Sequence, residues 1–275
     1  MFLIRAKSFR YYILVWIFAF CGQAWTMQGE VTMPQPDPSG FVQTLNQMGY
    51  MTSSLDPFSR EFVQYAATVQ DQVLEIGAAY GVATLEALKL GATIIANDLD
   101  ERHLEVLRNR APESLRTNLS LLPGRFPTDL EITSESISAI LISRVLHFFD
   151  GPTLIASAAE LFRYLKPGGK LFIVADTPYL KPFESFLPTY FERKARQIPW
   201  PGFIENLRDR VTHRAGQLPD FFHALDPEVL SQLLENAGFK IEKVEIFSQS
   251  QYPLDIQLDG REGVGCIAVK PGSPN

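Results

Sequence analysis

Short apolar runs alternate with segments of helical periodicity from residue 72 onward. The runs that we interpret as strands are QVLEIG (72–77), TIIAND (93–98), NLSLL (118–122), SAILIS (138–143) and KLFIVAD (170–176). Between them lie VATLEALKL (82–90), a short helix around Leu104 and Leu107, and a helix over residues 153–165. This alternation is typical of a doubly wound, mostly parallel α/β sheet.

The alternation stops after Asp176 and resumes near residue 225. The segment between is rich in aromatic residues and prolines, and we expect a helical lid insertion there, over about residues 177–226. A helix follows in LDPEVLSQLLENAG, with Asp226 as its N-cap, Pro227 at its first position and Gly238 after its end. The strands KIEKVEIF (240–247) and GCIAVK (265–270) close the pattern, and KPGG (166–169) predicts a turn between helix and strand.

The N-terminal segment differs from the rest of the chain. Three basic residues precede YYILVWIFAFC (11–21), an apolar run that is short for a spanning helix and suits the hydrophobic region of a signal peptide. Two interpretations of residues 1–26 stay open: a secretory or anchoring segment, or a translation start that lies later, at Met27 or Met33. Residues 27–39 are interpreted as a proline-rich linker, and the folded domain is predicted over residues 40–275.

Composition narrows the function. A chain of 275 residues with 46% hydrophobic residues can bury a large core, and its net charge of -6 does not favour binding to nucleic acids. The two cysteines, Cys21 and Cys266, are far apart and form no cluster with histidines. We therefore expect neither a metal site nor a disulfide framework.

The stretch VLEIGAAYG (73–81) is the strongest candidate for a binding site. Its strand ends at Glu75 and Ile76 and runs into a turn with glycines at 77 and 81. Such a turn brings backbone amides close to a ligand above the sheet edge. The glycine spacing of a dinucleotide-binding turn is not met, because positions 79 and 82 are Ala and Val. The turn therefore predicts a small-molecule site of another kind.

Several segments together resemble the class I S-adenosylmethionine-dependent methyltransferases, with a domain similar to the type 11 and type 12 methyltransferase domains. The resemblance rests on EIGAAYG, ANDLD, ILISRVLHFF, LKPGGKLFI and AGFKIEKVEIF, in that order, over roughly residues 72–270. It implies a Rossmann-like, seven-stranded, mostly parallel sheet with an antiparallel last strand, and S-adenosylmethionine as the cofactor. The chain departs from the family at Ala79, where a middle glycine is usual.

The resemblance also implies roles for individual residues. Glu75 and the backbone from Gly77 through Ala78 and Ala79 to Gly81 would bind the methionine portion of the cofactor. Asp98, at the end of the second strand, would accept from the ribose hydroxyls, while Leu99 would cover the adenine, and Asp100 is the better cap for the following helix. The remaining cofactor candidates are Arg125 and Phe126, in the region that contacts the adenine edge, and Ser143.

Methyl acceptors vary within this family, so no motif marks the catalytic residue. We expect the acceptor near Ser143, Arg144, His147, Asp176 and Tyr179, at the carboxyl ends of the fourth and fifth strands. The candidates for catalysis are His147, Asp176 and Tyr179, although His147 between apolar neighbours also suits a structural role. The asparagine-proline-proline motif of enzymes that methylate amino groups of nucleic acids and proteins is absent, which favours a small-molecule acceptor. Transfer of a methyl group from a sulfonium to this acceptor would be an in-line displacement.

Three further expectations concern partners and alternatives. Residues 177–218 hold seven basic and four acidic residues, and this net charge of +3 would attract an anionic acceptor or an anionic membrane surface. The alternative is a solvated pair of helices whose aromatic residues form a small separate core. We expect a cytoplasmic protein, because the cofactor is made there; the alternative is export or anchoring through residues 11–21. The alternative functions are a nicotinamide-dependent oxidoreductase and a non-catalytic protein that retains the scaffold.

Overall fold

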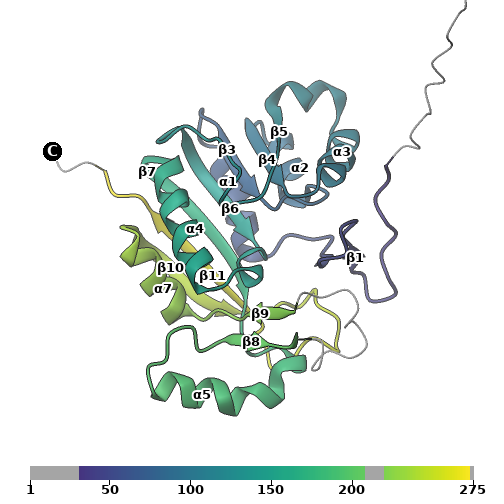
Figure 1. The fold of residues 1–275 in the computed structure, drawn as a ribbon. Helices are drawn as coiled ribbons and strands as arrows, with labels where there is room; N and C mark the ends of the chain where they lie inside the picture. The colour runs from purple at the N-terminus through teal and green to yellow at the C-terminus, as the bar shows by residue number, and fades with distance from the viewer. Residues whose placement is uncertain (1–30, 208–219, 273–275) are drawn as a thin grey trace, which may run out of the picture. The chain divides into compact units, whose positions relative to one another are not determined.

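The computed structural model describes residues 31–207 and 220–272. The signal-like segment and residues 208–219 of the expected lid lie outside these ranges. A seven-stranded sheet has the order β10-β11-β7-β6-β3-β4-β5 (Figure 1). Its strands are β3 (Val73–Ile76), β4 (Ile94–Asp98), β5 (Leu119–Pro123), β6 (Ile137–Ser143), β7 (Leu165–Asp176), β10 (Lys240–Phe247) and β11 (Gly263–Val269).

The sheet confirms the predicted topology. Strands β3 to β7 pair in parallel, while β11 runs antiparallel to both β7 and β10. Strands β3 and β6 are buried along almost their whole length, which explains why they appear in the sequence as unbroken apolar runs. The predicted KPGG turn falls inside β7 as an irregularity, because the register passes from Ile137 opposite Leu165 to Ala139 opposite Lys170.

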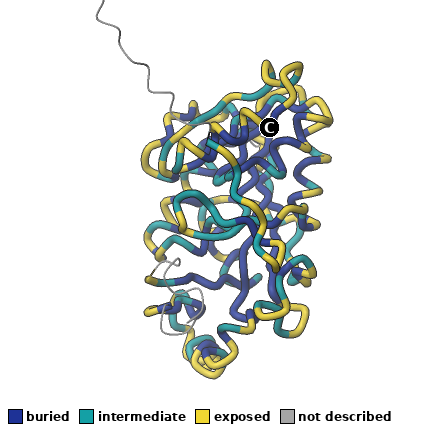
Figure 2. Tube along the Cα trace, turned by 90° about the vertical axis from the view of Figure 1, so that its right-hand side faces the viewer, coloured by how far each residue is buried: buried dark blue, intermediate teal, exposed yellow. Residues whose placement is uncertain are grey.

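Helices cover both faces of the sheet, and buried residues run through its strands while exposed residues gather at the turns (Figure 2). On one face, α1 (Pro57–Ala66), α2 (Val82–Lys89) and α3 (Glu101–Arg110) pack against strand residues such as Val73. On the other face, α4 (Gly151–Tyr164) and α7 (Pro227–Asn236) pack with strand residues such as Leu74. The side chains of neighbouring residues in a strand point to opposite faces of the sheet, so each strand contributes to the hydrophobic cores on both faces.

Several elements were not predicted from the sequence. Helix α1 begins after the N-cap Asp56, whose side chain accepts a hydrogen bond from the Ser59 amide. A short hairpin precedes it, formed by β1 (Val42–Gln43) and β2 (Tyr50–Met51). Val31 and Met33, in the expected linker, pack against the small cluster of Val42, Tyr80 and Val106. The chain before α2 thus contributes to the folded domain.

The segment after β7 contains helical and strand elements. They are η3 (Lys181–Phe186), α5 (Leu187–Ala195), β8 (Phe203–Glu205) and β9 (Phe221–His223). Their aromatic side chains form a separate core with Tyr179 and Tyr252. Two short 3-10 helices lie outside this segment: η1 (Glu113–Asn118) precedes β5, and η2 (Leu146–Phe148) follows β6. None of the helices in the described ranges combines the length and the apolar character needed to cross a membrane.

The close contact between α1 and β11 yields a test of the core. A Cβ atom added at Gly265 would lie 2.1 Å from two atoms of the Phe58 ring, whereas one added at Gly272 would meet no atom within 4 Å. We expect Gly265→Ala to lower the free energy of unfolding by about 1–3 kcal/mol through overpacking. Gly272→Ala, the matched control, should change it little. Urea unfolding of both variants measures this difference, and equal stability would contradict the described packing.

Candidate active site

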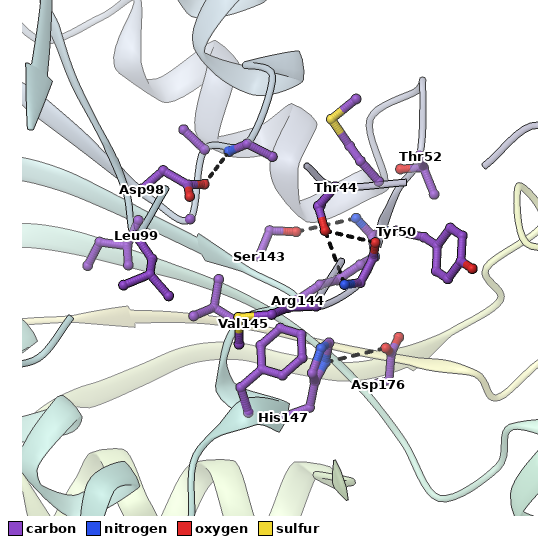
Figure 3. A pocket seen from close by; sticks show the side chains of 18 of the residues that line it. Thr44, Tyr50, Thr52, Asp98, Leu99, Ser143, Arg144, Val145, His147 and Asp176 are labelled. Carbon is purple, nitrogen blue, oxygen red and sulfur yellow. Dashed lines mark hydrogen bonds and ion pairs between the residues drawn. The ribbon is translucent and has the colours of Figure 1, made fainter. Parts of the chain in front are cut away.

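A cavity of about 540 Å³ lies at the carboxyl ends of β3, β4, β6 and β7. Figure 3 shows Asp98 and Leu99 on one side of it, and His147 and Asp176 on another, with Ser143 and Arg144 between them. The chain reverses its order of strands between β3 and β6, and such a point leaves a crevice above the sheet edge. The predicted cofactor end and acceptor end therefore share one cavity.

Steric constraints shape the turn between β3 and α2. Gly77 and Gly81 have positive φ angles, of 72° and 80°. A Cβ atom at Gly77 would lie 2.3 Å from Cγ2 of Val145, and one at Gly81 would lie 1.9 Å from Cδ1 of Leu107. Both positions therefore need glycine for its backbone conformation and for space. Ala79, where the family has a glycine, also has a positive φ of 45°.

Glu75 is a buried carboxylate that lines the cavity. Its side chain accepts a short hydrogen bond from the hydroxyl of Thr84 on α2. Burial raises the pKa of Glu75 to about 7, and the negative charge of Asp98 acts in the same direction. The carboxylate thus lacks enough positive charge around it, which suits a site for a cation such as the ammonium group of an amino acid.

Asp98 connects the turn to α3. Its Oδ2 accepts from the Ala79 amide at 2.8 Å, and its Oδ1 lies 2.9 Å from both the Asp100 amide and Nδ1 of His103. Asp100 caps α3, as predicted, by accepting from the Arg102 amide. A carboxylate has about four acceptor positions, so three donors leave Asp98 able to accept from a ligand hydroxyl.

The other predicted cofactor residues line the same cavity. Leu99 is 42% exposed and presents an apolar surface beside Asp98. Arg125 is exposed, while Phe126 is buried and also belongs to the core on the α4 side of the sheet. Ala78 and Ser143 complete the set, and all ten predicted cofactor residues except Gly81 are lining residues. Gly81 instead stands directly before α2 and shapes the turn.

Arg144 organises the acceptor end. Its Nε donates to the Tyr252 hydroxyl at 2.9 Å, and its Nη2 donates to Gln249 at 3.1 Å and to Asp56 at 3.3 Å. Burial opposes its charge, but Tyr252 and the carboxylates of Asp56 and Asp176 raise the pKa of Arg144 on balance. The guanidinium is therefore a fixed cation enclosed by its own partners.

His147 and Asp176 face each other in the cavity. Nδ1 of His147 lies 3.5 Å from Oδ2 of Asp176 and has no hydrogen-bond partner in the described part of the chain. Burial, with the charge of Arg144, lowers the pKa of His147 to about 3, so the imidazole is neutral. Burial raises the pKa of Asp176, against the effect of Arg144 and of the Tyr252 hydroxyl, which donates to its Oδ1 at 2.6 Å.

Tyr179 does not join this pair. It lies outside the cavity lining, packs against Tyr190 and Phe191, and carries the Arg261 guanidinium 3.7 Å from its ring centre. The expectation that residues at the end of β7 share the acceptor site therefore holds in the structure for Asp176 and not for Tyr179. The chain turns away from the cavity at this point, into the aromatic core of the lid.

The basic residues of the described lid are largely occupied within it. Lys194 pairs with Asp226 and Glu228, Arg196 pairs with Glu192, and Arg193 donates to the Phe203 carbonyl. None of these cations lines the cavity. The lid contributes apolar side chains to it instead, from Leu180, Phe183, Leu207 and Phe222. The described part of the lid is thus closer to an aromatic satellite core than to a basic surface.

Sequence reasoning missed several residues of the site. Tyr252 and Gln249 follow β10 and reach Arg144 across more than a hundred residues. Asp56 has the sequence signature of an N-cap and is one, yet it also pairs with Arg144. The hairpin residues around Thr44 and Tyr50 lie in a stretch with no periodic pattern. The usable signal in the sequence was Asp56 itself, because an aspartate directly before a proline is typical of a helix N-cap.

Known proteins resemble this chain in sequence. Residues 73–169 match the family model of a methyltransferase domain. The ubiquinone biosynthesis O-methyltransferase of Coxiella burnetii (strain Dugway 5J108-111) is 24% identical over 210 residues, which cover 74% of this chain and 78% of that protein. The demethylmenaquinone methyltransferase of Tropheryma whipplei (strain Twist) is 29% identical over 106 residues, covering 38% of this chain and 42% of that protein.

Solved structures share the fold. A S-adenosylmethionine-dependent methyltransferase of Methanosarcina mazei superposes with a TM-score of 0.57 at 18% identity, over 80% of this chain and all of that one. A glycopeptide N-methyltransferase in complex with S-adenosylmethionine gives a TM-score of 0.52 at 20% identity, over 78% of this chain and 86% of that one. The domain match identifies a methyltransferase domain in this chain and the solved structures share its class I fold, as the resemblance predicted, and S-adenosylmethionine is the cofactor that this family implies.

The described residues fit this cofactor. The under-neutralised carboxylate of Glu75 suits the ammonium group of its methionine portion. Asp98 retains acceptor capacity for the ribose hydroxyls, and the exposed side chain of Leu99 offers an apolar surface to the adenine. The three groups line one cavity.

The raised pKa of Glu75 predicts a gain in stability when its charge is removed. The folded state binds a proton at Glu75 up to about pH 7, whereas the unfolded chain releases it near pH 4.5. The free energy of unfolding therefore falls as pH rises between these values. We expect Glu75→Gln to be more stable than the wild type by up to about 3 kcal/mol at pH 8, and by little at pH 4.5.

The same variant should bind S-adenosylmethionine more weakly, because the ammonium loses its carboxylate. Urea unfolding at the two pH values and calorimetric titration at pH 8 measure both effects. Glu86→Gln, on the exposed side of α2, is the matched control and should change neither quantity. A variant at position 75 that loses stability at pH 8 would contradict the burial of an uncompensated charge.

Asp98 should contribute to cofactor affinity directly. We expect Asp98→Ala to weaken binding of S-adenosylmethionine by roughly 1–3 kcal/mol, through loss of charge-assisted hydrogen bonds. Asp129→Ala is the control, because this exposed carboxylate lies outside the cavity lining. Titration calorimetry compares the two variants. Unchanged affinity in Asp98→Ala would remove this residue from the cofactor site.

Proposed function

We propose that this enzyme transfers the methyl group of S-adenosylmethionine, by in-line displacement, to a hydroxyl of a small aromatic acceptor, and that His147 and Asp176 remove the hydroxyl proton. The observation that carries the proposal is the neutral, buried imidazole of His147, 3.5 Å from a buried carboxylate and in the same cavity as the cofactor turn. Because methyl transfer needs alignment and exclusion of water, a shared, largely apolar cavity supports it.

The walls of the acceptor end support an aromatic acceptor. Rings line the cavity around His147, which stacks on Phe222 at 4.6 Å between ring centres and contacts Phe148 edge to face. Aromatic pairs of this kind favour a flat ring as a further partner. One related enzyme is named for ubiquinone biosynthesis and another for demethylmenaquinone, which agrees with a ring-shaped acceptor.

The charges at this end favour a neutral acceptor over an anionic one. Arg144 is the cation nearest the pair, and it is already bound to Asp56 and Tyr252. One cation therefore stands against two acidic side chains, Asp56 and Asp176, which both act on Arg144. An anionic acceptor would therefore be repelled by the excess of acidic side chains. The proposed acceptor thus differs from the anionic one that the basic residues of the lid suggested.

A proton acceptor is needed because a phenolic hydroxyl holds its proton at neutral pH. Bound S-adenosylmethionine supplies an already activated methyl group. Nε2 of His147 receives the hydroxyl proton while Nδ1–H donates to Asp176, so the carboxylate stabilises the imidazolium. Burial keeps the imidazole of His147 neutral and able to accept a proton, and the carboxylate of Asp176 lies 3.5 Å from its Nδ1. We place the reaction in the cytosol, where the cofactor is made.

Substitution of the pair tests the mechanism. We expect His147→Asn and Asp176→Asn to lower kcat by about 10²–10⁴-fold with hydroxylated aromatic acceptors, while the Kd of S-adenosylmethionine changes by less than about threefold. Release of S-adenosylhomocysteine, measured over a panel of phenols and matched methoxybenzenes, gives the rates. Tyr179→Phe is the control variant and should retain activity.

Two outcomes would contradict the proposal. Full activity in both variants would remove the pair from proton transfer. If the wild type methylates amines or carboxylates and none of the phenols, its acceptor belongs to a different chemical class.

A further inference from the structure

The N-terminal hairpin, residues 41–52, covers part of the cavity. Its residues supply a large share of the lining, namely Phe41, Thr44, Asn46, Met48, Gly49, Tyr50, Met51 and Thr52. Figure 3 shows Thr44 and Tyr50 among the residues that line the same cavity as Arg144 and Asp176. The hairpin itself is small, with two ladder pairs between β1 and β2. Its placement must therefore come from contacts with the rest of the domain.

Those contacts lead to the cofactor end. The Leu45 amide donates to Nε2 of His103 at 3.0 Å, and Arg102 donates to the Leu45 carbonyl at 3.2 Å. The Tyr80 hydroxyl, from the turn between β3 and α2, donates to the Gln43 carbonyl at 2.9 Å. Thus the hairpin covers the acceptor end, while the turn and α3 hold it.

His103 joins the hairpin directly to Asp98, a predicted cofactor residue. It is 1% exposed, and its ring meets the Tyr80 ring edge to face at 5.2 Å. Nε2 accepts from a backbone amide, so it carries no proton, and the proton of the neutral ring lies on Nδ1. Nδ1 therefore donates to Oδ1 of Asp98, at 2.9 Å. One imidazole thus uses both nitrogens to connect Leu45 to Asp98.

We propose that His103 is a positioning residue that couples cofactor binding at Asp98 to closure of the hairpin over the acceptor. The inference rests on the proposed function, because it takes Asp98 as the ribose carboxylate. When the hairpin is docked, His103 is held by Leu45 and fixes Oδ1 of Asp98, which leaves the other acceptor positions aimed at the cavity. When the cofactor occupies Asp98, the carboxylate and the imidazole are held in place and the Leu45 amide has a ready acceptor.

Such coupling is reciprocal. A bound cofactor stabilises the closed hairpin by the same factor by which the closed hairpin tightens cofactor binding. The consequence is an order of events in which the cofactor binds first and the acceptor pocket is completed around it.

Two substitutions separate the two bonds of His103. In His103→Asn the amide nitrogen can replace Nδ1 and donate to Asp98, but the side chain is too short to reach Leu45. In His103→Gln the amide oxygen can replace Nε2 and accept from Leu45, but the donor to Asp98 is lost. Arg102→Ala is the matched control on α3, because it removes a hydrogen bond to the hairpin and the ion pair with Asp100 but keeps the bonds of His103 to Leu45 and to Asp98.

Hydrogen exchange of amides 41–52, with and without saturating S-adenosylmethionine, is the readout, together with calorimetric affinity for the cofactor. In the wild type we expect the cofactor to slow exchange of these amides by at least about fivefold, with α4 as the unchanged reference. In His103→Asn the hairpin should exchange faster even without cofactor and lose the response, while affinity falls by about fivefold, the factor that reciprocal coupling requires. In His103→Gln the hairpin should keep its protection without cofactor, while affinity falls by about fivefold or more and the response disappears.

The control and the failures are distinguishable. Arg102→Ala should loosen the hairpin and keep the response to cofactor, and thermal unfolding by circular dichroism shows that each variant folds. Wild-type hairpin exchange that ignores bound cofactor, or a response that survives in both His103 variants, would overturn the coupling and leave the proposed function standing. Absence of cofactor binding to the wild type would overturn both.

Discussion

The carboxylate of Asp98 is the interaction on which the site depends. It accepts from the Ala79 amide in the turn, from the Asp100 amide at the start of α3, and from His103. These donors come from the turn and from α3 with its N-cap, and a buried carboxylate needs such donors because an unpaired charge in the interior is costly. The parallel pairing of β3 and β4 brings the turn and Asp98 to the same edge of the sheet. The carboxylate of Asp98 thus fixes the backbone of the turn and of the start of α3, and these donors in turn compensate its buried charge.

The two ends of the cavity treat buried charge differently. At Glu75 the carboxylate is left short of positive charge, and this is the position where a cationic ligand group is expected. At Arg144 the cation is surrounded by Asp56, Gln249 and Tyr252 and has little capacity left for a ligand. An uncompensated charge favours binding, whereas a fully bonded one supports its neighbours. One end of the cavity therefore has a charge available for a ligand, whereas the charge at the other end holds the surrounding side chains in place.

The sequence predicted the sheet well because strands buried on both faces appear as continuous apolar runs, as in β6 and β7. It also predicted the caps Asp100 and Asp226, since a polar residue before a helical period has a local role. It failed where the outcome depends on distant contacts. The hairpin and α1 lie between residue 40 and the first predicted strand, in a part of the predicted domain for which no element was predicted. Tyr179 was misplaced because its position after β7 carries no information on the direction of the chain.

The acceptor end is assembled from parts of the chain that are far apart. Arg144 bonds to Asp56, Gln249 and Tyr252 across 88, 105 and 108 residues. By contrast, the bonds of Asp98 to Ala79 and His103 span 19 and 5 residues. Closing a long loop costs more entropy than closing a short one, and contacts of long range slow folding. During folding, the cofactor turn can therefore form before the acceptor end, which must wait until the last two strands have joined the sheet.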